Sequence, residues 1–219
     1  MAEIIPIEFG KSVLPESMIF SGGKKNKYRP IVFMIYLVKT EDKLILVDAG
    51  CETMPGFVTE DFIGPVEALK KLNITPSDIT DVIITHAHYD HIECVNRFKN
   101  AAVYIQSDEY EAGKDFFDKS ANVRIFDESA EICKNVKAVK IGGHTSGSCI
   151  VEIIENTHTY IIAGDECYLR ECLNKKIPTG SSFCPKKSRE FISKYSGKNY
   201  IVYLSHEKFD APRPCDGLD

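Results

Sequence analysis

The sequence lacks a long apolar run, a basic leader segment and an excess of positive charge. Met1 to Gly10 contains neither a basic region nor an apolar stretch, so we expect no signal peptide, no membrane contact and a cytoplasmic location. The formal net charge is -5, which argues against a nucleic-acid partner because phosphate backbones attract basic proteins. These absences favour a protein that acts on a small molecule.

The sequence also lacks any Cys-x-x-Cys pair, although it contains eight cysteines. A structural zinc site built from cysteines is therefore not expected. The even count suggests disulfides, but without a secretion signal and in a chain of this length we expect reduced thiols. The sequence alone assigns none of the cysteines a function.

No internal repeat and no low-complexity segment divides the chain. Its 219 residues suit one domain, and hydrophobic and charged residues make up 43% and 27%, as in ordinary globular enzymes. We therefore expect residues 1–219 to form a single domain.

Apolar patterning predicts strands and helices that alternate along the whole chain. A hairpin is expected over Ile31 to Val38 and Leu44 to Val47, and helices over Pro65 to Leu72, with Asn73 as C-cap, and over Pro185 to Tyr195. Ser107 is expected to cap a helix that runs to about Phe117, supported by Glu109 and Glu111 near its start. Further strands are expected at Asp81 to Ile84, Ala101 to Ile105, Val136 to Ile141, Cys149 to Ile154, Tyr160 to Ala163 and Tyr200 to Leu204. An αββα sandwich, with two mixed sheets packed face to face and helices outside, fits this layout, but other α/β folds fit it too.

The segment Thr85-His86-Ala87-His88-Tyr89-Asp90-His91 carries the strongest chemical signal. Three histidines and an aspartate lie within six residues, directly after a predicted buried strand. Imidazoles at alternate positions can converge on one cation, while Asp90 and His91 point toward a second. The sequence therefore predicts a metal site here.

Other strand ends supply further ligand types. His144 and His206 each follow a strand-like segment, whereas the sixth histidine, His158, is expected to be an ordinary surface residue. Asp165 follows the apolar run Ile161 to Gly164, where a carboxylate costs free energy unless it is paired or bound to metal. Asp165 could bridge two cations or be a turn acid. Asp48 could orient a ligand histidine or only cap a turn.

Taken together, these residues resemble the metallo-β-lactamase superfamily. The motif His86-x-His88-x-Asp90-His91 is its hallmark, and the elements around His144, Asp165, His206 and Asp48 follow in the family's order. The resemblance implies the αββα fold with the metals at one edge. It implies that His86, His88 and His144 hold one metal, that Asp90, His91 and His206 hold a second, and that Asp165 bridges them. Zinc is the expected metal, with iron and manganese as alternatives.

Within the superfamily the chain is most similar to the N-acyl homoserine lactone lactonases. Tyr168 stands three residues after Asp165, where those enzymes place a tyrosine that contacts substrate, and Glu109-Tyr110-Glu111-Ala112 also looks like theirs. Two departures affect the loops. Glu93-Cys94-Val95 replaces the family's Gly-Gly, and Gly142-Gly143 and Ser146 replace prolines around His144.

The resemblance implies a dinuclear hydrolase in which a metal-bound hydroxide attacks the carbonyl of a lactone or another small ester. Asp90 is the candidate to pass a proton to the leaving group, and the Tyr168 hydroxyl the candidate to stabilise the oxyanion, although Tyr168 could instead be a packing aromatic. A thioester hydrolase of the glyoxalase II type and a non-catalytic metal-binding or sensor protein are the alternatives. The physiological substrate and the oligomeric state cannot be read from the sequence.

Overall fold

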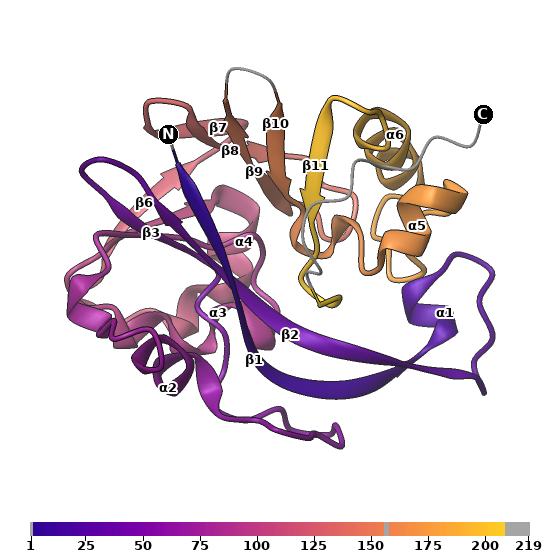
Figure 1. The fold of residues 1–219 in the computed structure, drawn as a ribbon, viewed down its shortest axis with the longest axis horizontal. Coiled ribbons are helices and arrows are strands. Elements are labelled where there is room, and N and C mark those ends of the chain that lie inside the picture. The colour runs from indigo at the N-terminus through magenta and orange to yellow at the C-terminus, as the bar shows by residue number, and fades with distance from the viewer. Residues whose placement is uncertain (1, 156–157, 209–219) are drawn as a thin grey trace.

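The computed structural model describes residues 2–155 and 158–208, whose strands form two mixed sheets (Figure 1). The first sheet has the order β1-β2-β3-β4-β5-β6, comprising Glu3–Pro15, Tyr28–Lys39, Leu44–Val47, Asp81–Ile83, Ala102–Gln106 and Asn122–Phe126. The second has the order β11-β10-β9-β8-β7, comprising Tyr200–Tyr203, Thr159–Ile162, Cys149–Ile154, Val136–Lys140 and Ser129–Cys133. The expected hairpin of β2 and β3 is confirmed, since the two strands pair antiparallel.

Helices lie on the outer side of each sheet. The chain forms α1 to α6 over Glu16–Ile19, Gly64–Lys70, Tyr89–Ile92, Ser107–Gly113, Arg170–Lys175 and Pro185–Tyr195. Short 3₁₀ turns occupy Pro76–Asp78, Glu93–Arg97, Lys114–Phe116 and Gly164–Glu166. Helices α2, α3 and α4 lie beside the first sheet, and α5 and α6 beside the second (Figure 1). The αββα sandwich expected from the sequence is confirmed.

The period-two alternation of the strands divides the apolar side chains between two layers. Tyr36 and Val38 of β2 point toward the second sheet, where Val151 and Ile162 belong to the same buried cluster. The intervening Ile35 and Leu37 belong to the cluster that includes the helices. The sequence of β2 is therefore a nearly continuous apolar run, because both faces of this strand are buried.

Both ends of helix α4 differ from those expected. Gln106, not Ser107, is the N-cap of α4, because its side-chain oxygen accepts hydrogen bonds from the N–H groups of Asp108 (2.7 Å) and Glu109 (3.4 Å). The α-helix ends at Gly113, four residues before Phe117, and the chain continues from there to Phe116 as a 3₁₀ turn.

Helix α2 ends two residues before the expected point. Its C-cap is Lys71, and Asn73 lies beyond it with a φ of 58°. Asparagine tolerates this left-handed conformation better than most residues, which explains why it resembles a helix-ending residue in the sequence.

Strand β1 was not predicted. It pairs only with β2 within its sheet, and it contains Pro6, which cannot donate a backbone hydrogen bond, as edge strands permit. A β-carbon at Gly10 would overlap the ring of Phe62, so the strand needs glycine at that point. Among the described residues, none of the helices has the length and apolar character that crossing a membrane requires.

Candidate metal centre

The predicted ligands meet at one edge of the sandwich, where parallel neighbours in both sheets reach their carboxyl ends. Strands β3 and β4 run parallel in the first sheet, and β10 and β11 run parallel in the second. The histidine cluster follows β4, Asp165 follows β10, and His206 follows β11. His144 reaches the same edge from the turn between β8 and β9. The topology thus brings together residues that lie up to 120 positions apart.

Four side chains form a first group: His86, His88, His144 and Asp165, whose ligand atoms all lie within 4.8 Å of one another. His88 Nδ1 is 2.9 Å from His86 Nε2 and 3.0 Å from His144 Nε2. Asp165 Oδ2 is 3.7 Å from His86 Nε2 and 3.5 Å from His144 Nε2. Donors around a tetrahedral zinc ion are about 3.4 Å apart, so these atoms are spaced as ligands of one ion would be.

A second group consists of Asp90, His91 and His206. Asp90 Oδ2 lies 3.5 Å from His91 Nε2 and 3.9 Å from His206 Nε2. The other oxygen of Asp165 faces this group, with Oδ1 3.3 Å from His91 Nε2 and 3.1 Å from His206 Nε2. Asp165 therefore stands between the two groups and turns one oxygen toward each.

The donor set fits divalent metal ions. His91 Nε2 and Asp165 Oδ1 are buried atoms without a hydrogen-bond partner, in positions where a cation would complete their bonding. Burial alone would raise the pKa of Asp165, but the neighbouring His206 and His91 lower it well below its usual range. Burial, followed by the neighbouring His91, lowers the pKa of His86 well below its usual value. Both residues are thus held in the protonation states that bind metal.

Access to the groups is uneven. His88 is exposed, whereas His86, His144 and Asp165 are buried. In the second group the Asp90 side chain is 11% exposed, against 2% for His91 and 3% for His206. A small molecule therefore reaches the centre from the side of His88 and Asp90.

Asp48 contacts His91 at Nδ1, the ring nitrogen that does not face the other ligands. Its Oδ2 lies 2.8 Å from His91 Nδ1, and its two oxygens also accept hydrogen bonds from the N–H (2.8 Å) and hydroxyl (3.0 Å) of Thr85. An Nδ1–H donated to Asp48 leaves Nε2 of His91 free to bind a cation. Of the two interpretations of Asp48, the geometry favours the orienting role.

Tyr168 lies beside the ligands, as expected. Its ring stacks on that of His206, with centroids 4.8 Å apart and an interplanar angle of 16°. Burial and then the carboxylates of Asp165 and Asp90 raise the pKa of Tyr168 well above its usual value, so the hydroxyl keeps its proton. The ring thus has a packing role, while the hydroxyl stays able to donate a hydrogen bond.

Two buried glutamates near the ligands were not identified from the sequence as site residues. Glu109 was assigned only to the first turns of a helix, yet it is 2% exposed and accepts hydrogen bonds from the ligand loops. The segment Glu109 to Ala112, which resembles the lactonases, was the one signal that pointed to it.

Glu166 follows Asp165 and is fully buried. Its Oε1 accepts hydrogen bonds from the N–H groups of Gly143 (3.0 Å) and His144 (3.2 Å) and from the Ser148 hydroxyl (2.5 Å). Burial raises its pKa to about 7, although these hydrogen bonds act in the opposite direction. Glu166 fixes the turn that carries His144, and no pattern in the sequence indicated this.

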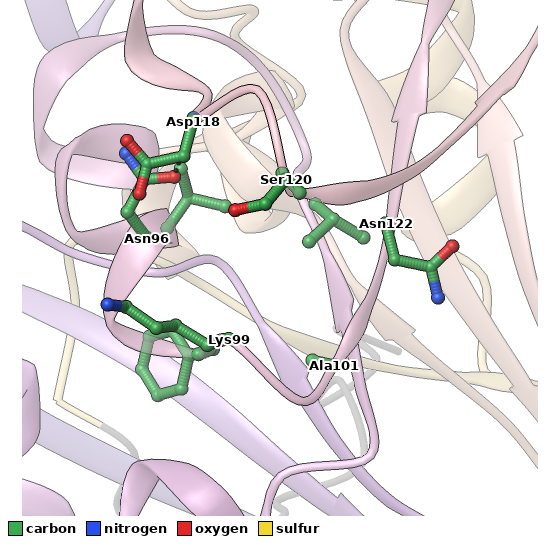
Figure 2. Close-up of a pocket in the computed structure, with 10 residues that line it drawn as sticks. Asn96, Lys99, Ala101, Asp118, Ser120 and Asn122 are labelled. Carbon is green, nitrogen blue, oxygen red and sulfur yellow. Dashed lines mark hydrogen bonds between the residues drawn. The ribbon is translucent and has the colours of Figure 1, made fainter.

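His158 and the seven cysteines of the described residues belong to neither ligand group. His158 is half-buried directly before β10, at the end of that strand opposite to Asp165. The seven cysteines within the described part of the chain are free thiols, while Cys215 lies outside it. A cavity of about 30 Å³ lies near Asn96, Asp118 and Ser120 (Figure 2), and none of the seven predicted ligands lines it. A space of that size holds about one water molecule, not a substrate.

Comparisons with known proteins agree with this geometry. A family model described as the metallo-beta-lactamase superfamily matches residues 34–190. The chain belongs to the metallo-β-lactamase superfamily. A probable metallo-hydrolase of Methanocaldococcus jannaschii is 30% identical over 74% of this chain and 70% of that protein.

Lactonases of the same superfamily are also among the relatives. An N-acyl homoserine lactonase of Bacillus thuringiensis is 25% identical over 92% of this chain and 91% of that protein. A solved structure of a quorum-quenching N-acyl homoserine lactone lactonase, 25% identical, superposes with a TM-score of 0.76 over 93% of this chain and 91% of that chain. The resemblance to the lactonase branch of the metallo-β-lactamase superfamily is therefore confirmed, and the family together with the histidine and aspartate groups supports divalent metal ions.

Proposed function

We propose that this chain is a dinuclear metal-dependent hydrolase that opens lactones or other small esters. The observation that carries the proposal is the position of Asp165, which turns Oδ2 toward His144 and Oδ1 toward His206 at 3.5 and 3.1 Å. A carboxylate in that position could bind two ions at once, one through each oxygen. Seven ligand-type residues are also more than one tetrahedral ion uses.

Two groups of ligands of this kind suit zinc, with iron and manganese as alternatives, because imidazole and carboxylate donors serve all three. Bound ions would supply a water molecule acidified to near-neutral pKa and a Lewis acid for the carbonyl. The chain's own contribution is to place the donors and to keep Asp165 and His86 in the metal-binding protonation state.

Asp90 is the group we assign to proton transfer. It is the most accessible member of the second group, with 11% of its side chain exposed, and its Oδ2 is turned toward His91 and His206. A carboxylate that binds through one oxygen has a second oxygen to carry a proton to the leaving alkoxide. Tyr168, buried against His206 with its proton retained, would donate a hydrogen bond to the developing oxyanion.

The surroundings support a small substrate with an apolar part. A cavity of about 670 Å³ borders His206 and is lined in part by Val13, Ile31, Val58 and Leu169. That volume is within the range of small-molecule sites. The apolar side chains suit a hydrocarbon substituent, while Lys11, Arg29 and Glu60 make another part of the lining charged. The names of the related lactonases point to lactones. We propose neither a nucleic-acid nor a membrane partner.

A substrate panel tests the proposal against both alternatives. The protein, loaded with zinc, is assayed on an N-acyl homoserine lactone, an aryl ester and an acyl thioester, with Asp165→Ala as the inactive control and Glu111→Gln, an exposed acid, as the active one. Turnover highest on the lactone or ester supports the proposal. Turnover highest on the thioester indicates a glyoxalase II type of activity. No turnover at full metal occupancy indicates a non-catalytic metal protein.

A further inference from the structure

Glu109 is a buried carboxylate outside the predicted ligands. It lies on α4, is 2% exposed, and accepts three hydrogen bonds. Its Oε2 accepts from the N–H of Ala87 at 2.8 Å, and its Oε1 accepts from the Thr145 hydroxyl at 2.5 Å and from the N–H of Gly147 at 2.9 Å. A buried carboxylate needs such partners, because burying an unpaired charge is strongly unfavourable.

The three donors belong to the two loops that carry the histidines of the first group. Ala87 stands between His86 and His88, so its hydrogen bond to Glu109 fixes the peptide plane that joins it to His86, in the short segment that carries both imidazoles. Thr145 follows His144 directly, and Gly147 is two residues further in the same turn. One carboxylate thus ties together the backbones of all three histidine ligands of the first group.

Helix α4 is itself fixed against these loops. Gln106, its N-cap, approaches Gly147 so closely that a β-carbon there would overlap the Gln106 side-chain oxygen. At the other end of the helix, a β-carbon on Gly113 would come within 2.9 Å of the side chain of Ala87. The helix therefore holds Glu109 in a rigid position between the two loops.

We propose that Glu109 is a positioning residue that preorganises His86, His88 and His144 for the first metal ion. This inference rests on the proposed dinuclear function. Each loop on its own can rotate its imidazole away from the ion, and the shared carboxylate removes that freedom in both loops together. Partners that orient metal ligands in this way typically contribute about 10- to 100-fold in metal affinity.

Glu109→Gln is the informative substitution, because it keeps the volume of the side chain. An amide presents one acceptor oxygen and one NH₂ group, whereas the site presents backbone N–H donors on both sides. Either orientation of the amide therefore places the NH₂ group against the N–H of Ala87 or that of Gly147. Glu111→Gln is the matched control on the same helix, since Glu111 is 71% exposed and pairs only with nearby Lys114 among the ion pairs described.

The experiment measures the two zinc affinities by competition with a chromogenic chelator, in the wild type, Glu109→Gln and Glu111→Gln. We expect one of the two zinc ions to bind about 10- to 100-fold more weakly in Glu109→Gln, with the other ion and the Glu111→Gln control unchanged. Cobalt loaded in place of zinc gives a second readout, since its visible absorption reports the coordination geometry. A change in that spectrum for one ion only is expected.

Two zinc ions bound to Glu109→Gln with wild-type affinity would overturn the inference. Equal weakening of both ions would also overturn it, because a general loss of folding acts on both groups. If Glu109→Gln does not fold, Thr145→Val replaces it, since this change removes one donor and keeps the shape. It should weaken the same ion by a smaller factor. A wild type that binds fewer than two ions contradicts the proposed function, which is a separate outcome.

Discussion

Asp48 and His91 form a buried pair, with Asp48 Oδ2 2.8 Å from His91 Nδ1 and both side chains 2% exposed. Asp48 adopts a φ of 63°, a left-handed conformation that aspartate and asparagine tolerate better than most residues. Strained backbone of this kind persists where the surroundings fix it, and here it aims the carboxylate at His91 and Thr85 together.

We therefore expect Asp48→Asn to weaken binding of the second ion by about 10- to 100-fold while the protein still folds. If the amide NH₂ faces His91, Nδ1 must accept, the proton moves to Nε2, and Nε2 can no longer bind metal. If the amide is turned round, its NH₂ faces the N–H of Thr85 instead. Metal titration followed by circular dichroism checks this, and two ions bound with unchanged affinity would show that Asp48 only caps its turn.

The position of Asp165 predicts an unequal ranking of ligand substitutions. Asp165→Ala removes a donor from both groups, whereas His144→Ala and His206→Ala each remove a donor from one. We expect Asp165→Ala to lose both ions and the most activity, and each histidine variant to retain the ion of the other group. Elemental analysis and turnover of the three variants test the ranking. If Asp165→Ala retains both ions, Asp165 does not bridge them.

Tyr168→Phe separates the hydroxyl from the ring. The ring should remain stacked on His206, so metal content and melting temperature should not change. Loss of an oxyanion donor typically costs about 100-fold or more, but a metal ion shares this task, so we expect about a tenfold loss of turnover on a lactone or ester. Full activity of Tyr168→Phe on the best substrate would mean that the hydroxyl takes no part in the reaction.

Gly143→Ala should destabilise the turn that carries His144. A β-carbon at Gly143 would overlap Glu166 Oε2 and lie 2.8 Å from Ser188 Oγ. Overpacking of this kind costs about 1–3 kcal/mol of unfolding free energy. Gly197→Ala is the control, because the nearest atoms to a β-carbon there are 3.7 Å away. Urea denaturation of both variants measures the difference, and equal stability would contradict the close packing of Glu166 on this turn.

The sequence predicts best those elements whose apolar pattern is uninterrupted. Leu44–Val47 and Pro185–Tyr195 were predicted with their observed bounds. Strand β1 was missed because Glu3, Glu8 and Lys11 interrupt its apolar residues, as an exposed edge strand allows. The predicted N-cap of α4, Ser107, was wrong by one residue. Gln106 performs that role, and glutamine is not among the usual capping residues.

Some residues of the site were likewise predicted from the sequence, and others were not. The histidine cluster was visible because its residue types and spacing are rare without a metal. Glu109 and Glu166 were not identified as site residues, because their roles depend on contacts with residues that are distant in the chain. These contacts lie at least 22 positions away for Glu109 and at least 18 for Glu166. A single sequence records that a glutamate is present, but not that folding buries it against a ligand loop.

The number of metal ions per chain tests the central claim most directly. Protein purified without chelator, then saturated with zinc and freed of excess metal, is analysed for zinc and for protein concentration. Two ions per chain, about 3.5 Å apart as in other two-metal hydrolases, are predicted from the paired groups around Asp165. A stoichiometry of one that does not rise on further addition of zinc, iron or manganese would contradict the account.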